Sequence, residues 1–142
     1  IEKIYLSKSP VVSDMRLGDR VVIYRTSDGQ SSARYRSVVS SICTVVEVKN
    51  LSSFQDKNDF LAYVKGRSVF SQDELEDFWA SRRFPWVISL LFNFPFDRYP
   101  TRGELLDRHL IPEGRLTCTS ISDDNFRNII GLGGVDEGYI ID

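Results

Sequence analysis

Histidine, methionine and cysteine are scarce in this 142-residue sequence, which has one His, one Met and two Cys. With no second histidine, His109 is a poor candidate for a histidine-based metal site or a hydrolytic dyad. Its place in the last turn of a predicted helix suits the helix dipole instead. Cys43 and Cys118 lie far apart and lack metal-type spacing. We interpret both as buried thiols in apolar strands and in a reducing cytoplasm, rather than as a disulfide or a nucleophile.

Long apolar runs and an excess of positive charge are also missing. The longest apolar stretch, WVISLLF, has the length of a buried strand and is far shorter than the roughly 18 residues of a membrane span. The formal net charge is −2, so the chain has no global positive field that would attract nucleic acid. We therefore expect no membrane partner, and any binding of RNA or DNA has to use a local basic patch.

A catalytic constellation is not evident either. The acidic residues are scattered, and those in the segment 73–77 crowd a helix start, where they complement the helix dipole and face water. The GLGG segment at 131–134 lacks the lysine and Ser/Thr of a phosphate-binding loop, and it follows a predicted helix instead of preceding one. We expect no catalytic residue, no metal site and no cofactor in this chain. Any catalysis is expected in another domain of the same polypeptide.

The sequence does contain segments with two different hydrophobic periodicities, one typical of strands and one typical of helices. Those that alternate or are rich in β-branched residues predict strands at residues 1–7, 21–24, 37–48, 84–94 and 116–121. Those with helical spacing predict helices at residues 54–66, 71–83, 101–110 and 122–131. Capping boxes at Ser71–Glu74 and Thr101–Glu104 are predicted to start the second and third of these helices, and Ser122 is predicted to cap the last. This order predicts one α+β domain with inserted helices, whose small mixed, mainly antiparallel sheet closes into a pseudo-β-barrel because closure removes exposed edges.

The two ends of the chain differ from this domain pattern. The sequence begins with Ile1 and its only methionine is Met15, which favours a piece of a longer polypeptide with an upstream domain. Gly131 is placed to end the last helix. The glycine-rich, acidic segment 131–142 is interpreted as a flexible tail or an artificial end, which leaves 1–130 as the domain.

Arginine and tyrosine are concentrated in residues 16–36, which hold five arginines, two acids and no lysine. The stretch YRTSDGQSSARYR has an aromatic-basic pair at each end and Asp28-Gly29 as the expected turn at its tip. Arginine forks bind phosphate oxygens, and both arginine and tyrosine stack on bases. The predicted nucleic-acid-binding residues are Arg20, Tyr24, Arg25, Arg34, Tyr35, Arg36, Trp79, Arg82 and Arg83. An alternative of equal weight is that these arginines are solvated strand-edge residues that discourage aggregation between sheets.

The segment MRLGDRVVIYRT resembles the signature of PUA-like domains, particularly their EVE and ASCH branches. In those domains a Gly-Asp turn, here Gly18-Asp19, leads into a barrel strand that ends in an aromatic residue, here Val21 to Tyr24. The next long strand corresponds to Val38 to Val48. The chain is most similar to PUA-like domains fused behind acetyltransferase-like (GNAT) domains, over residues 1–130.

The resemblance implies a pseudo-barrel that binds RNA or DNA, often with a modified or flipped base in a pocket between barrel and helices. The Gly-x-Lys-x-x-Glu-x-Arg signature of ASCH domains is missing, and so is the tryptophan that EVE domains carry in their first strand. The remaining pocket candidates are Tyr24, Arg25, Tyr35, Arg36, Trp79 and Trp86. Trp86 lies on the most apolar strand face, so core packing is the interpretation favoured for it.

Three functions follow as hypotheses. The first is an accessory domain that binds RNA or a modified base and targets a larger cytoplasmic protein, with an acetyltransferase-like domain upstream. The second is a protein-interaction or small-ligand-sensing regulatory domain that does not bind nucleic acid. The third, an enzyme that acts on nucleotides, has the least support because the sequence offers no acid–base pair.

Overall fold

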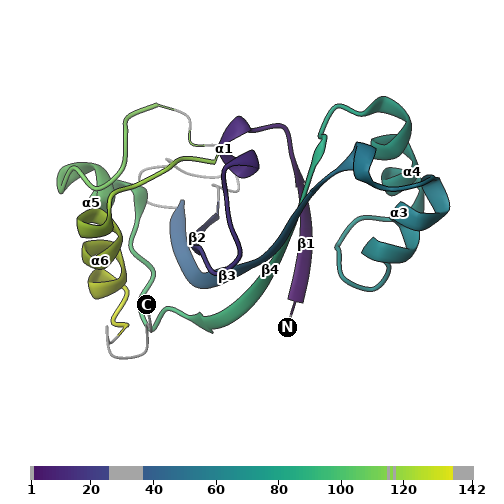
Figure 1. Cartoon of the computed structure of the whole chain (residues 1–142). Helices are drawn as coiled ribbons and strands as arrows, with labels where there is room; N and C mark the ends of the chain where they lie inside the picture. The colour runs from purple at the N-terminus through teal and green to yellow at the C-terminus, as the bar shows by residue number, and fades with distance from the viewer. Residues whose placement is uncertain (1, 26–36, 115, 117, 136–142) are drawn as a thin grey trace. The chain divides into compact units, whose positions relative to one another are not determined.

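The computed structural model describes residues 2–25, 37–114, 116 and 118–135 and has a mixed α+β architecture (Figure 1). The strands of this described part form an antiparallel sheet in the order β1-β4-β3-β2. The strands are β1 Glu2–Ser7, β2 Arg20–Arg25, β3 Val38–Asn50 and β4 Trp86–Pro95. The helices are α1 Pro10–Ser13, α3 Lys57–Val64, α4 Gln72–Ser81, α5 Arg102–Asp107 and α6 Asp123–Leu132, with a 3-10 turn η1 at Leu51–Ser53. The prediction of an α+β fold is confirmed.

The chain divides into two compact units. The first unit comprises Ile1–Arg20 and Thr44–Phe92, and the second comprises Val21–Cys43 and Asn93–Asp142. The division falls within β2, β3 and β4, so each unit takes part of these strands.

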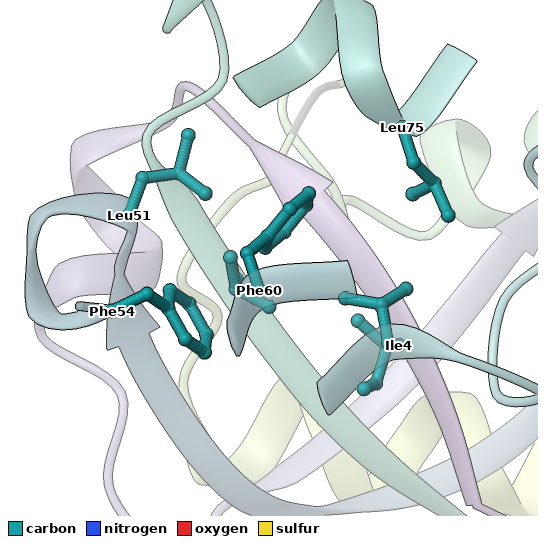
Figure 2. Close-up of a cluster of buried hydrophobic side chains, with 7 residues drawn as sticks. Ile4, Leu51, Phe54, Phe60 and Leu75 are labelled. Carbon is teal, nitrogen blue, oxygen red and sulfur yellow. The ribbon is translucent and has the colours of Figure 1, made fainter. Parts of the chain in front are cut away.

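The core of the first unit is built from aromatic and aliphatic side chains of strands and helices. Its buried members are Ile4, Leu51, Phe54, Phe60, Val64, Leu75 and Val87. Phe60 of α3 lies among Leu51, Phe54 and Ile4 (Figure 2) and is fully buried. The Phe54 and Phe60 rings meet edge to face, with their centroids 5.5 Å apart, a favourable geometry for two aromatic quadrupoles.

A local capping signal starts α4 of the first unit as the sequence predicts. Ser71 accepts a hydrogen bond from the Glu74 amide, and the Glu74 carboxylate accepts one from the Ser71 amide, which completes the predicted capping box of α4. Phe70 packs on Phe78 of the same helix with ring centroids 4.9 Å apart. The last turn is closed by Arg82, whose φ of 58° is left-handed.

The core of the second unit joins β3 to the helices α5 and α6. Its buried members are Val39, Ile42, Phe96, Leu105, Leu110, Ile129 and Ile130. Thr101 and Glu104 form the second predicted capping box at the start of α5, and Ser122 caps α6 as predicted. The helix predicted over 101–110 is shorter in the structure, where α5 ends at Asp107. Leu110 therefore contributes to this core from the segment that follows the helix.

Several sequence predictions differ from the structure. The strand predicted at 116–121 is wrong, because the described residues 116 and 118–121 belong to no strand. No helix was predicted between the strands expected at 1–7 and 21–24, but this segment contains the short helix α1, which Ser9 caps and Pro10 begins. The last helix continues past Gly131 to Leu132, and Gly133 is its C-cap. The turn at Asp28-Gly29 lies outside the described residues.

Strand β4 is buried on both faces over part of its length. The sequence places Ile88 and Leu90 on one apolar face, and both are buried. The opposite face is buried as well, because Val87 and Ser89 are both 0% exposed. A polar serine in the interior therefore has to find a hydrogen-bond partner, which it does in Glu2 of β1.

None of the helices in the described part of the chain has the length and the hydropathy that a bilayer crossing requires.

Candidate nucleic-acid interface

The predicted binding residues are distributed over both units. Those of the first unit are Arg20, Trp79, Arg82 and Arg83, and those of the second unit are Tyr24 and Arg25. Arg34, Tyr35 and Arg36 lie outside the described residues. The described candidates therefore fall into two groups, one in each unit.

Arg20 holds the turn that precedes it. Its Nη1 donates to the carbonyl of Gly18 at 2.9 Å and lies 3.4 Å from Oγ1 of Thr44. The same turn is joined to β3 by the Gly18 amide, which donates to the Val45 carbonyl. The φ of Gly18 is +92°, which glycine adopts without steric cost. Arg20 is thus engaged in fixing the Gly-Asp turn.

Trp79, Arg82 and Arg83 lie at the C-terminal end of α4. The Arg82 guanidinium carbon is 4.1 Å from the centroid of the Trp79 ring, and this ring also stacks on Phe60 at 5.6 Å. Arg83 lies over the ring of Phe84 at 5.6 Å. Cation–π contacts of this kind contribute about 0.5–1 kcal/mol at exposed sites. Trp79 is therefore packed against the core of the first unit, and Arg82, the C-cap of the same helix, covers its ring.

Tyr24 and Arg25 end strand β2 in the second unit, and each contacts the segment that starts α5. The guanidinium of Arg25 lies over the ring of Tyr99, 5.6 Å from its centroid. The hydroxyl of Tyr24 accepts a hydrogen bond of 3.4 Å from Nη1 of Arg102. Two consecutive residues of β2 thus contact two residues of the segment 99–102. We name Tyr24, Arg25, Tyr99 and Arg102 the Arg–Tyr cluster.

The Arg–Tyr cluster combines an exposed part with an anchored part. Arg25 is exposed and the Tyr99 side chain is 43% exposed, so an approaching base or phosphate can reach both. Tyr24 packs against the buried core of the second unit, and Arg102 is half-buried. Nη2 of Arg102 donates a second hydrogen bond of 2.5 Å to the carbonyl of Gly114.

Sequence reasoning missed Tyr99 and Arg102, although a signal for them is present. The segment DRYPTRG repeats the aromatic-basic pairing of the YRTSDGQSSARYR stretch, with Arg98-Tyr99 next to Pro100. Arg98 itself is paired with Glu104 at 2.7 Å. A search for every Arg-Tyr pair, rather than for one dense stretch, would have found this segment.

Comparison with known proteins does not assign the chain. No family model, no curated protein and no solved structure gives a significant match. The assignment of a function therefore depends on the side chains themselves.

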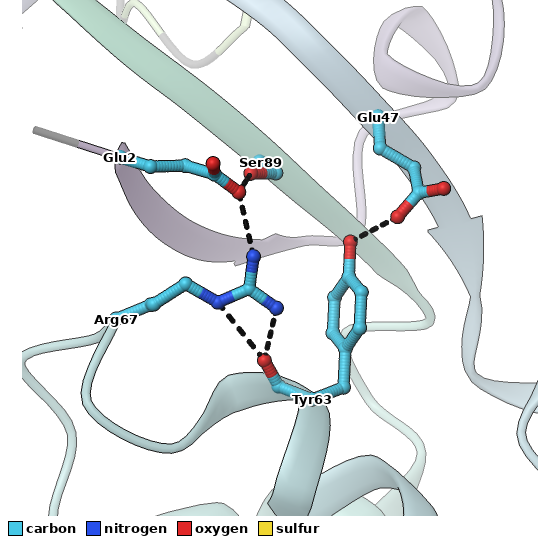
Figure 3. Close-up of polar contacts among 5 residues, drawn as sticks. All are labelled: Glu2, Glu47, Tyr63, Arg67 and Ser89. Atoms are coloured by element: carbon cyan, nitrogen blue, oxygen red, sulfur yellow. Dashed lines mark hydrogen bonds and ion pairs between the residues drawn. The ribbon is translucent and has the colours of Figure 1, made fainter.

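A polar network in the first unit joins β1, β3, β4 and α3 (Figure 3). Arg67 donates from Nη1 to Oε1 of Glu2 at 2.6 Å, and the Ser89 hydroxyl donates to the same oxygen at 2.5 Å. Arg67 also donates through Nε and Nη2 to the backbone carbonyl of Tyr63. The Tyr63 hydroxyl donates to Oε1 of Glu47 at 2.5 Å.

The protonation states of this network favour a structural role. The hydrogen bond from Ser89, together with the bond and charge of Arg67, lowers the pKa of Glu2 below its ordinary value. Burial, together with the Glu47 carboxylate, raises the pKa of the Tyr63 hydroxyl. Glu2 is therefore held as an anion and Tyr63 as a neutral phenol, which suits a lock between elements better than a general acid–base pair with a pKa near neutrality.

Other candidate chemistry is weak in the described part of the chain. No group of three or more His, Cys, Asp and Glu residues there could hold a metal ion. Cys43 is buried, as predicted, and its burial raises the pKa of its thiol to about 11. Cys118 is half-buried and lies outside any strand, and burial raises the pKa of its thiol as well. High thiol pKa values oppose nucleophilic catalysis at neutral pH.

A hollow of about 350 Å³ lies on α4 and is lined by Asp73, Glu74, Asp77 and Phe78. The carboxylates of this lining repel phosphate, so the hollow does not fit a nucleic-acid backbone. Glu74 is moreover used in the capping box of α4. Among the groups of described residues compared above, the Arg–Tyr cluster is the one whose side chains suit both a phosphate and a base.

Proposed function

We propose that this chain is a nucleic-acid-binding accessory domain that targets a larger cytoplasmic protein to RNA. The observation that carries the proposal is the exposed pair of Arg25 and Tyr99 at the end of β2. A guanidinium and a phenol ring side by side offer a charge for a phosphate and a flat surface for a base. The local sequence adds Arg34, Tyr35 and Arg36 shortly after β2, although these residues lie outside the described part.

The mode of binding follows from the chemistry of this pair. A single-stranded segment lays one base against the Tyr99 ring, and base–aromatic stacking contributes about 1–3 kcal/mol. Arg25 then leaves the ring and donates to a phosphate oxygen. The net charge of −2 supports a small number of phosphate contacts rather than a broad basic surface.

The proposal includes the PUA-like assignment and a pseudo-barrel closure of the sheet. It is supported by the Gly18-Asp19 turn before β2, which joins β3 through its backbone. It is further supported by the start of β3, where the consecutive residues Val38 and Val39 are both buried and point to opposite faces of the strand. The fusion behind an acetyltransferase-like domain belongs to the proposal on the strength of the sequence resemblance alone.

The proposal is tested by titrating the chain with fluorescein-labelled single-stranded RNA at several salt concentrations. We expect the affinity to fall with salt, with a log–log slope of about −1 to −2, because each phosphate contact on a single strand contributes about −0.7. Arg25→Gln is expected to weaken binding and reduce the slope by about 0.7. Arg108→Gln is the matched control, because Arg108 is an exposed arginine of the same unit that caps α5 with its backbone.

Two results would overturn the proposal. One is the absence of saturable RNA binding by the wild-type chain, and the other is binding that responds neither to salt nor to Arg25→Gln. The regulatory alternative then gains weight, and it predicts a ligand-induced rise of the melting temperature or capture by the upstream domain.

A further inference from the structure

We infer that Arg102 is a positioning residue of the Arg–Tyr cluster, which fixes Tyr24 and the Gly114 carbonyl and does not itself contact the nucleic acid. The inference rests on the proposed function and deepens it, because it assigns different roles to two arginines of one cluster. Arg25 is the arginine that meets phosphate, and Arg102 is the arginine that keeps the end of β2 in place.

The side chain of Arg102 already uses both terminal nitrogens. Nη1 donates to the hydroxyl of Tyr24 at 3.4 Å, and Nη2 donates to the carbonyl of Gly114 at 2.5 Å. The two acceptors come from chain segments on either side of α5 in sequence. A planar guanidinium presents its donors in a fixed fork, so one side chain can tie two such acceptors together. A lysine ammonium, as a compact point charge, does not reproduce this fork.

The backbone around Arg102 is anchored independently of its side chain. The Arg102 amide donates to the carbonyl of Ser37 at 2.8 Å, and the carbonyl of Pro100 accepts from the Val39 amide at 3.0 Å. Thr101 also bridges to Val38. The segment 99–102 is therefore held against the start of β3, and Arg102 extends from a fixed base toward Tyr24.

The hydrogen bond between Arg102 and Tyr24 also affects the exposed pair of Arg25 and Tyr99, because each of these residues lies close in sequence to one of the bonded partners. Tyr24 precedes Arg25 in β2, and Tyr99 precedes Arg102 in the anchored segment by three positions. When the Arg102 fork holds the Tyr24 hydroxyl, the end of β2 is fixed relative to the segment that carries Tyr99. Loss of the fork releases the end of β2, so that Arg25 is no longer held in advance beside Tyr99, although it can still reach a phosphate.

Two substitutions at this position separate positioning from phosphate contact. Arg102→Lys keeps the positive charge and loses the fork, whereas Arg102→Gln loses both. A positioning role predicts that the two variants weaken RNA binding similarly, by about 3- to 10-fold, as expected for one or two lost hydrogen bonds. The salt slope then stays at the wild-type value in both, because no phosphate contact is removed. Tyr24→Phe is expected to change affinity in the same direction, by a smaller factor.

A phosphate-contact role predicts a different pattern. Arg102→Lys would then retain nearly wild-type affinity, and Arg102→Gln would reduce the slope by about 0.7, as for Arg25→Gln. That pattern would overturn the inference. Melting curves of each variant identify any that fails to fold, in which case Tyr24→Phe removes the same hydrogen bond with a smaller change.

A second measurement keeps the inference testable if the wild-type chain does not bind RNA, an outcome that defeats the proposed function alone. The chain is labelled with ¹³Cζ-tyrosine, and the Tyr24 resonance is identified by its loss in Tyr24→Phe. A positioning role predicts that this resonance shifts in Arg102→Lys, while that of Tyr63, bonded to Glu47 in the first unit, does not. An unchanged Tyr24 resonance would show that the Arg102 guanidinium does not hold this hydroxyl, and it would refute the inference.

Discussion

Gly133 meets the ring of Phe96 so closely that a Cβ atom on this residue would lie 2.3 Å from Cδ2 of the ring. Gly133 is the C-cap of α6, and Phe96 is 3% exposed in the core of the second unit. The φ of Gly133 is −78°, a value that any residue can adopt. Glycine is therefore required here because a side chain would collide with the Phe96 ring, and not because of the backbone conformation. The amide of Arg98 also donates to the Gly133 carbonyl. Residue 133, which lies within the segment expected to be a flexible tail, therefore packs closely on the core of the second unit.

We expect Gly133→Ala to reduce the free energy of unfolding by about 1–3 kcal/mol, because the buried Phe96 ring has to shift. Gly131→Ala is the matched control in the same helix. A Cβ at Gly131 meets open space, and alanine is the better helix former, so this variant is expected to be more stable by about 0.5–1 kcal/mol. Urea unfolding of both variants measures the two effects. Equal stability of the two variants would contradict the packing described for Gly133.

A second prediction concerns the pH dependence that Glu2 brings to the first unit. The pKa of Glu2 is lowered in the folded chain, first by the hydrogen bond from Ser89 and then by Arg67. A lowered folded-state pKa means that the carboxylate stabilises the fold above its ordinary pKa of 4.5, and that this contribution is lost as the pH falls through the lowered value.

Comparison of the wild-type chain with Glu2→Gln should therefore show a difference in stability near neutral pH that shrinks as the pH falls below the ordinary pKa of 4.5. The difference is expected to be below about 1 kcal/mol, because one third of each side chain in the Glu2–Arg67 pair is exposed and water screens the charges. Glu76→Gln, at the more exposed Lys57–Glu76 pair, is the control and should change stability little. A Glu2→Gln difference that grows on acidification would have the wrong sign and would refute the argument.

Local signals explain what the sequence could predict of the fold. The capping boxes at Ser71 and Thr101 depend on residues three positions apart, so they can be recognised without knowledge of the rest of the chain. Strands β1 to β4 were likewise evident from period and β-branched content. The strand expected at 116–121 was wrong because alternation over a few residues does not guarantee a partner strand.

The candidate site was predicted less completely because it depends on contacts between distant segments. Arg102 and Tyr24 are far apart in sequence, and nothing in the local pattern of either segment reveals that they meet. The dense Arg/Tyr stretch pointed to β2, which carries Tyr24 and Arg25, but it gave no indication of Tyr99. Conversely, Trp79 looked available for stacking in the sequence, whereas in the structure Phe60 and Arg82 contact its ring.

A third prediction tests the left-handed residue that closes α4. Arg82 has a φ of 58°, a conformation that costs most side chains about 1 kcal/mol or more and costs glycine little. Arg82→Gly removes this cost but loses the contact with Trp79, worth about 0.5–1 kcal/mol, so the two changes should nearly cancel. Arg82→Ala loses the contact and keeps the backbone cost. We expect chemical unfolding to show Arg82→Gly more stable than Arg82→Ala by about 1 kcal/mol, and the reverse order would contradict a left-handed cap at this position.

A fourth prediction follows from the burial of Cys43, whose side chain is 0% exposed and whose pKa is raised by burial to about 11. The thiolate is the form that reacts with disulfide reagents, so at about pH 8 the reactive fraction is lower by about 100-fold than for a thiol with the ordinary pKa of 9.0. In a Cys118→Ser variant, which leaves Cys43 as the remaining cysteine, we expect labelling by an aromatic disulfide reagent to be slow in buffer and fast in denaturant. The reciprocal Cys43→Ser variant reports on the half-buried Cys118 and should label faster in buffer. Fast labelling of Cys43 in the native chain would mean that this part of β3 is open to solvent, which would also weaken the core on which the Arg–Tyr cluster is anchored.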